Sequence, residues 1–120
     1  MSFNDDNTSI SFFKEKVREF VEERDWMEYH TPKNLVQALN CEAGELSQLM
    51  LFKDYEKEDI VNNDELLTNI LDEAADVFIY LISLMNSIDS DLTSAFIKKM
   101  EKNKEKYSIS EFNNGKYYKK

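Results

Sequence analysis

Residues 65–87 of the chain read ELLTNILDEAADVFIYLISLMNS. This stretch contains neither glycine nor proline, and its apolar residues recur at the three- and four-residue spacing of an α-helix. From Val77 to Met85 it is apolar almost all round, more than a helix with a solvent-facing side carries. We therefore expect a long helix, capped by Asp64, that lies at the centre of the fold and extends into a subunit interface.

Three further helical patterns accompany this central helix. The first covers residues 11–24, and the last covers residues 92–107. Before the central helix, Thr31 is a good N-cap and Pro32 suits the first position of a helix that we expect to end near Phe52. With two glycines and one proline in 120 residues, the turn signals of an all-β fold are missing. The sequence predicts an all-α, four-helix bundle.

The chain has the length of one domain. We expect this domain over residues 11–107, between a flexible N-terminus (residues 1–10) and a flexible tail (residues 108–120). The single cysteine, Cys41, cannot form an internal disulfide, and its apolar neighbours suit a small buried side chain. Because the N-terminus is polar and no apolar run is long enough to cross a bilayer, we expect a cytoplasmic protein without membrane contact.

The charge of the chain excludes one class of partner. The formal net charge is −9 and the isoelectric point is about 4.6. Proteins that bind nucleic acid polymers need a basic face that displaces counterions from the phosphate backbone, so we expect no such partner. A small phosphate substrate remains compatible with the charge, because bound divalent cations reverse the local sign of a carboxylate site.

Four carboxylates occupy positions in or beside the apolar stripes of two helices. They form two pairs, each spaced by three residues: Glu42 with Glu45, and Glu73 with Asp76. At roughly 100° per residue, the first member of each pair falls within its stripe and the second at the edge. An ionised carboxylate in such a place is costly unless it has a cation, a hydrogen-bond network or a raised pKa. These four residues are therefore the candidate catalytic and metal-binding side chains.

A metal ion is the cation that best fits this pattern. No lysine or arginine occurs between Lys57 and Lys98, so the central helix supplies no basic partner. Side chains three apart on a helix lie roughly 5–6 Å apart at Cβ, so each pair offers two neighbouring oxygen ligands. Oxygen-only ligation suits Mg²⁺, with Mn²⁺ as a possible substitute. Two or three such ions would roughly balance four carboxylates and a triphosphate.

Two other interpretations of the carboxylates fit the sequence less well. Either pair alone is more often a solvated helix face, but two pairs on separate apolar stripes favour the metal site. A ferritin-like di-iron bundle would require a Glu-x-x-His motif on each of two helices. The only histidine, His30, lies in the connector between the first two predicted helices, so this class is excluded.

Five segments carry a resemblance to a known family. They are ERDW at 23–26, HTPKNL at 30–35, EAGEL at 42–46, EAADVFIYL at 73–81, and the set Lys99, Met100, Asn103, Lys106 and Tyr107. In this order they resemble the MazG-like, all-α NTP pyrophosphatase superfamily, and more particularly its dCTP pyrophosphatase branch. The resemblance covers about Phe12 to Tyr107 and implies a four-helix MazG-like bundle completed by oligomerisation.

The same resemblance implies an activity. It is the hydrolysis of a nucleoside triphosphate, dCTP or a related pyrimidine nucleotide, between the α- and β-phosphates, which gives a monophosphate and pyrophosphate and serves nucleotide-pool sanitation. Mg²⁺ would be held by Glu42, Glu45, Glu73 and Asp76. One carboxylate would orient or deprotonate the attacking water, and Glu45 is our choice for this role.

Substrate-binding residues follow from the resemblance as well. The nucleoside pocket would comprise Trp26, His30, Asn34, Phe52 and Tyr80, and the phosphates would meet Lys99, Asn103, Lys106 and Tyr107 from a neighbouring helix or subunit. Two positions depart from the branch: Phe52 stands where tryptophan is frequent, and Lys106 where arginine is common. The first exchange changes the size of a stacking face and the second loses bidentate geometry, so the base preference stays open.

The apolar run 77–85 also predicts self-association, because exposing it would create a large apolar patch. We expect a homo-oligomer, with a tetramer favoured over a dimer. Two alternative functions remain. One is a hydrolase of dUTP or of other modified or non-standard nucleotides. The other is a non-enzymatic, acidic helical interaction protein, which would spread its carboxylates over the surface.

Overall fold

The computed structural model describes residues 2–120 and is all-helical, as predicted, with no strand in these residues. Its elements are α1 (Ile10–Glu23), the 3₁₀ helix η1 (Met27–Tyr29), α2 (Pro32–Gln48), α3 (Lys57–Val61), α4 (Asp64–Ser87), α5 (Leu92–Lys106) and the 3₁₀ helix η2 (Asn113–Gly115). Among residues 2–120, no helix combines the length and the apolar character needed to cross a lipid bilayer.

Polar caps set where the four longer helices begin. The side chains of Ser9, Thr31, Asn63 and Asp91 each accept a hydrogen bond from the backbone N–H three residues later, at 2.8–3.3 Å. Such caps satisfy backbone donors that the first turn of a helix leaves free. The predicted cap Thr31 is confirmed. The cap of α4 is Asn63 rather than Asp64, which is the first residue of the helix.

The chain between α2 and α4 differs from the prediction. The second helix ends at Gln48 instead of near Phe52, and turns follow until Phe52 adopts a left-handed φ of 57°. The charged segment beyond it contains α3, where Glu56 and Asp59 form a reciprocal capping box. Five residues are too few to show a helical period, so the sequence predicted a loop there.

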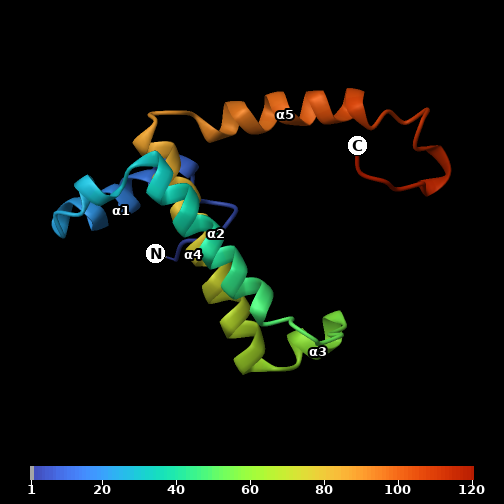
Figure 1. Cartoon of the computed structure of the whole chain (residues 1–120), viewed down its shortest axis with the longest axis horizontal. Helices are drawn as coiled ribbons and strands as arrows, with labels where there is room; N and C mark the ends of the chain where they lie inside the picture. Colours follow the sequence, from blue (N-terminus) through green and yellow to red (C-terminus); the bar gives the residue numbers. More distant parts are fainter. Residues whose placement is uncertain (1) are drawn as a thin grey trace. The chain divides into compact units, whose positions relative to one another are not determined.

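The chain divides into two compact units, the first ending at Asp89 and the second running from Ser90 to Lys120. In the first unit, α2 and α4 pack antiparallel along most of their lengths, and α1 and α3 both pack on α4 (Figure 1). The buried apolar side chains of the described residues are few: Val21, Leu35, Leu66 and Ile82. Cys41 is exposed, so its predicted burial is wrong; it lies about 100° around α2 from the inward-facing Glu42.

Asn86 near the end of α4 ties α1 in place. Its amide nitrogen donates to the Lys14 carbonyl at 3.0 Å, and its oxygen accepts from the Arg18 guanidinium at 3.1 Å. Further along the same contact, Phe13 meets Phe78 edge to face with ring centroids 5.2 Å apart. These contacts hold α1 against α4. They thereby fix the positions of the α1 side chains within the first unit.

The second unit consists of α5 and a tail that folds back on the end of this helix. The Lys120 backbone N–H donates to the Tyr107 hydroxyl at 3.0 Å, and the Tyr118 hydroxyl donates to Glu111 at 3.0 Å. The Phe112 ring contacts both tyrosine rings in tilted arrangements, with centroids 5.3 Å from Tyr107 and 4.7 Å from Tyr118. The predicted flexibility of residues 1–10 and 108–120 stays a prediction, and Met1 lies outside the described residues.

Replacing the Asn86 amide tests the link between α1 and α4. We expect Asn86→Ala to lower the free energy of unfolding by about 1–3 kcal/mol, because two hydrogen bonds are lost and the Lys14 carbonyl is left without this donor. Urea denaturation measures the effect. Asn69→Ala, an exposed change in the same helix, is the matched control. Equal stability of both variants would show that Asn86 does not brace α1.

Candidate active site

The antiparallel packing of α2 and α4 brings the predicted carboxylates together. One oxygen each from Glu42, Glu73 and Asp76 lies within 4.8 Å of the others, and all three side chains are half-buried. Glu45, one turn further along α2, is exposed and lies within hydrogen-bonding reach of both Glu42 and Glu73. The two pairs that the sequence spaces by three residues therefore face each other across one helix interface.

Two atoms of this cluster need a partner that the protein does not supply. The Oε2 atoms of Glu42 and Glu73 are buried and have no hydrogen-bond partner among the described residues. A buried acceptor without a partner is costly, more so when it is charged. The donor set consists only of carboxylate oxygens, which Mg²⁺ and Mn²⁺ prefer. The residues present therefore fit a hard divalent cation.

Crowding also changes the protonation of the cluster. Hydrogen bonding to Glu45, burial, and the charges of Glu45 and Asp76 raise the pKa of Glu42 to about 7. Burial, followed by hydrogen bonding to Glu45 and the charges of Glu45 and Asp76, raises the pKa of Glu73 above its usual range. Without a cation, the cluster thus retains protons at pH values where an isolated glutamate would be ionised.

A cavity of about 570 Å³ opens beside the carboxylates. Its wall comes from α1, α4, α2 and the connector between α1 and α2, and it is largely apolar. The lining residues are Phe13, Lys16, Val17, Phe20, Val21, Trp26, His30, Glu42, Asp76, Phe78, Ile79, Tyr80 and Ser83. Mostly apolar cavities with a few converging polar groups are typical of small-molecule sites.

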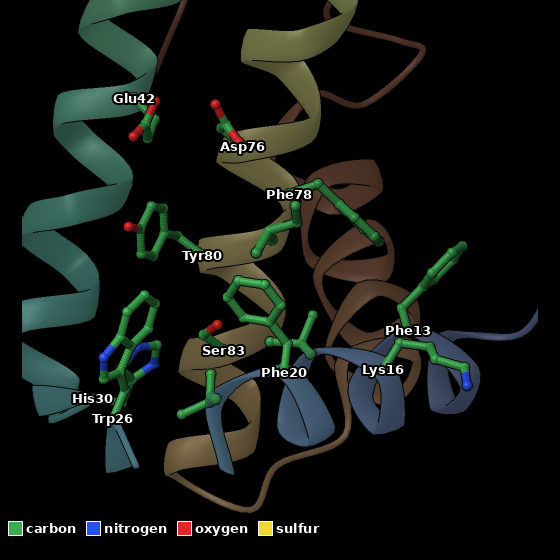
Figure 2. A pocket seen from close by; sticks show the side chains of 13 residues that line it. Phe13, Lys16, Phe20, Trp26, His30, Glu42, Asp76, Phe78, Tyr80 and Ser83 are labelled. Atoms are coloured by element: carbon green, nitrogen blue, oxygen red, sulfur yellow. The ribbon is translucent and has the colours of Figure 1, made fainter. Parts of the chain in front are cut away.

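The two ends of the cavity differ in chemistry. In Figure 2, Glu42 and Asp76 lie at one end, Trp26 and His30 lie at the other, and Tyr80 projects between them. An anionic group with a bound cation could be held at the carboxylate end, while a planar ring could stack at the aromatic end. The arrangement therefore suits an elongated ligand with a phosphate at one end and an aromatic ring at the other.

Local contacts organise the aromatic end. The Trp26 ring meets Phe20 edge to face at 5.9 Å, and the Arg24 guanidinium lies 3.7 Å from the Phe20 ring centroid. The Asn34 amide donates to the Tyr29 carbonyl at 3.0 Å, so Asn34 holds the connector at the start of α2 and does not line the cavity. His30 is half-buried, and burial lowers its pKa, so its imidazole is neutral at pH 7.

Besides Asn34, five residues predicted to bind the substrate are not part of the cavity lining. Phe52 is 96% exposed and follows the far end of α2, a helix of 17 residues that spans about 25 Å. The other four lie in the second unit, where Lys99 and Lys106 are exposed and Tyr107 accepts the bond from Lys120; the four are Lys99, Asn103, Lys106 and Tyr107. Their roles stay predictions.

Some of the lining residues were not predicted as site residues. Phe13, Val17 and Phe20 belong to the helical pattern at residues 11–24, and they face the cavity. Periodicity identifies an inward face but cannot say whether that face meets protein or empty space. Ser83 was also missed, although it and Tyr80 are the only residues with a polar side-chain atom in the apolar run 77–85. A serine within this apolar run was therefore the sequence signal that could have identified Ser83 as a site residue.

The comparisons with known proteins fall in one group, although no family model matches. Over 92 residues the chain is 38% identical to "dCTP pyrophosphatase 1" of Rattus norvegicus, covering 76% of this chain and 54% of that protein. Over 90 residues it is 38% identical to the Homo sapiens protein of the same name, covering 74% and 53%. The chain spans about half the length of these curated relatives. The crystal structure of a pyrophosphatase from Archaeoglobus fulgidus matches with a TM-score of 0.76 at 30% identity, covering 89% of this chain and 99% of that chain.

The raised pKa of Glu42 predicts how stability changes with pH in the metal-free protein. The proton that Glu42 retains stabilises the fold fully below its usual pKa of 4.5, and this contribution is lost as the pH rises through about 7. Glu42→Gln cannot ionise, so we expect it to gain stability relative to the unmodified protein between pH 5 and pH 8. Denaturation in a chelating buffer measures this difference. Asp72→Asn, an exposed change beside Glu73, is the control; parallel pH profiles for all three proteins would contradict the clustered arrangement.

Proposed function

The chain belongs to the MazG-like all-α NTP pyrophosphatase family, and from this premise we propose that it hydrolyses a nucleoside triphosphate between the α- and β-phosphates. The products would be a nucleoside monophosphate and pyrophosphate. One observation carries the proposal: the carboxylate cluster of α2 and α4 opens onto a cavity whose far end is aromatic. The converging carboxylates and their unpartnered oxygens disfavour the alternative of an acidic interaction protein.

The proposed metal site consists of Glu42, Glu45, Glu73 and Asp76, with Mg²⁺ as the ion and Mn²⁺ as a substitute. Bound ions of this kind polarise phosphoryl oxygens and stabilise a leaving pyrophosphate. The protein itself would fix the positions of the four ligands through the rigid packing of two helices. It would also keep the unpartnered oxygens of Glu42 and Glu73 directed into the site.

We propose that Glu45 orients and deprotonates the attacking water. This residue is the exposed member of the cluster, whereas the other three are half-buried and share the 4.8 Å group of oxygens. An exposed carboxylate at the edge of the cluster can accept a proton from water and pass it to solvent. Such a group contributes to catalysis by orienting the water and by acting as a general base.

The proposed substrate is dCTP or a related pyrimidine deoxynucleotide. The name "dCTP pyrophosphatase 1" of the relatives supports this choice, and so does a cavity that places Trp26, His30 and Tyr80 together. A planar base would stack at Trp26, and the sugar would pass Tyr80 on the way to the carboxylates. Phe52 and Lys106 differ from the residues frequent in the dCTP pyrophosphatase branch, so dUTP or modified nucleotides are the alternative substrates.

We further propose that the working form is a homo-oligomer, a tetramer rather than a dimer. Leu71 and Ile79 on α4 are 58% and 44% exposed, and Phe52 is almost fully exposed. Phe52 does not line the cavity of its own chain, and in this proposal it would complete the nucleoside pocket of another subunit. Lys99, Asn103, Lys106 and Tyr107 of α5 and its end would contact the phosphates.

Removing a carboxylate charge tests the activity. We expect Glu42→Gln and Asp76→Asn each to lower turnover at least about a hundredfold while the helical content is retained, because charge stabilisation at the reacting site is lost. Pyrophosphate release should be measured across nucleoside triphosphates with and without Mg²⁺, which tests reaction and substrate together. Asp72→Asn should keep full activity. Near-normal turnover in both cluster variants would refute the metal-site assignment.

Complementation between variants tests the shared pocket. We expect Phe52→Ala and Asp76→Asn to be weakly active when each is made alone. Co-expressed, they should regain about a quarter of the normal activity, since half of the sites have an intact Asp76 and half of these meet an intact Phe52. Light scattering after size-exclusion chromatography gives the oligomeric state. A fully active monomer, or no recovery in the mixture, would exclude the contribution of Phe52 to another subunit.

A further inference from the structure

Ser83 is a polar residue at an apolar position of α4. Its side chain is only 4% exposed, and it stands in the apolar run between Val77 and Met85. One turn later, Ser87 satisfies its hydroxyl by donating to the Leu84 carbonyl at 2.7 Å. Among the described residues, no such bond occupies the Ser83 hydroxyl. Because Ser83 lines the large cavity, its hydroxyl is open to a hydrogen bond with a molecule bound there.

The surroundings of Ser83 show where that partner would be. Ser83 and His30 both line the large cavity, and both also line a second cavity of about 50 Å³. Beyond this shared wall, the small cavity is bordered by polar side chains that include Arg18, Asn86 and Ser87. Ser83 and His30 are thus polar residues of the large cavity that lie toward the end opposite the carboxylates (Figure 2).

The spacing along α4 matches the length of a nucleotide. Asp76, Tyr80 and Ser83 are separated by four and then three residues, which keeps them on one face of the helix. At a rise of 1.5 Å per residue, Ser83 lies about 10 Å along the axis from Asp76. This separation is close to the distance from the α-phosphate of a nucleotide to the outer edge of its base. Figure 2 shows these three side chains in sequence along α4, with His30 and Trp26 near the Ser83 end.

We infer that Ser83 is a specificity-determining residue, whose hydroxyl forms a hydrogen bond with the polar edge of the substrate base beside His30. The inference rests on the proposed function and specifies which residues read the base. A serine hydroxyl can both donate and accept, and a neutral imidazole has one donor and one acceptor nitrogen. The edge of a pyrimidine carries acceptors together with an amine or a ring N–H, so the pair can complement it while Trp26 supplies the stacking face.

Removing the hydroxyl is the direct test. For Ser83→Ala we expect a KM about tenfold higher for the preferred pyrimidine nucleotide, with kcat changed less than about twofold, because one base contact is lost far from the reacting atoms. The ratio of kcat/KM between dCTP and dUTP should move toward one. Ser87→Ala is the matched control, since its hydroxyl is bound to the helix backbone. Ser83→Thr, which restores a hydroxyl, should recover part of the preference.

A second measurement separates this inference from the proposed function. Trp26 is the only tryptophan, so its fluorescence reports binding of dCMP and dUMP directly, without turnover. If the unmodified protein hydrolyses no triphosphate, the proposed function fails, but weaker monophosphate binding by Ser83→Ala would still support base recognition. If Ser83→Ala folds normally and keeps the KM, the base preference and the monophosphate affinity, the inference is overturned. Should Ser83→Ala prove unstable, Ser83→Cys provides the same comparison with a weak hydrogen-bonding group.

Discussion

Carboxylates that repel one another lie at the contact between α2 and α4. Two long helices that could have joined through apolar residues alone instead place Glu42, Glu73 and Asp76 within a few ångströms of one another. The cost is visible in two unpartnered oxygens and in the raised pKa of Glu42. Apolar packing elsewhere must hold the helices together against this repulsion, and the buried apolar side chains of the two helices are Leu35, Leu66 and Ile82. The carboxylate cluster thereby lowers the stability of the folded protein at the place where the site needs charge.

The cavity depends on the same pair of helices and on one helix laid across them. Because α1 is tied to α4 through Asn86, the side chains of Phe13 and Phe20 form a wall instead of filling the space beside Tyr80. The fold thus separates two tasks. The α2 and α4 pair positions charge, whereas α1 and the connector define an apolar space next to it, and the two meet at Glu42 and Asp76.

Much of this arrangement was predictable from the sequence, and the exceptions have physical reasons. Cap residues and periodicity located the long helices, and the two acidic pairs predicted the cluster, because each of these signals lies within one element. Periodicity ranks the faces of a helix but does not say what each face meets, so Cys41 was expected to be buried and no cavity was expected beside the helix at residues 11–24. Phe52 and Trp26 were expected in one pocket, yet a whole helix separates them within the chain.

The length of α2 limits which insertions and deletions the chain can accept. If Phe52 contributes to the pocket of a second subunit while Glu42 belongs to the site of its own chain, the length of α2 sets the spacing between the two sites. An inserted or deleted residue between them would rotate one end relative to the other by about 100° and shift it by about 1.5 Å. Insertions and deletions should therefore not be tolerated within α2. They should be tolerated in the charged segment at residues 53–63, where α3 begins and ends with its own caps. In relatives and in designed variants alike, a gap within α2 would signal a changed assembly.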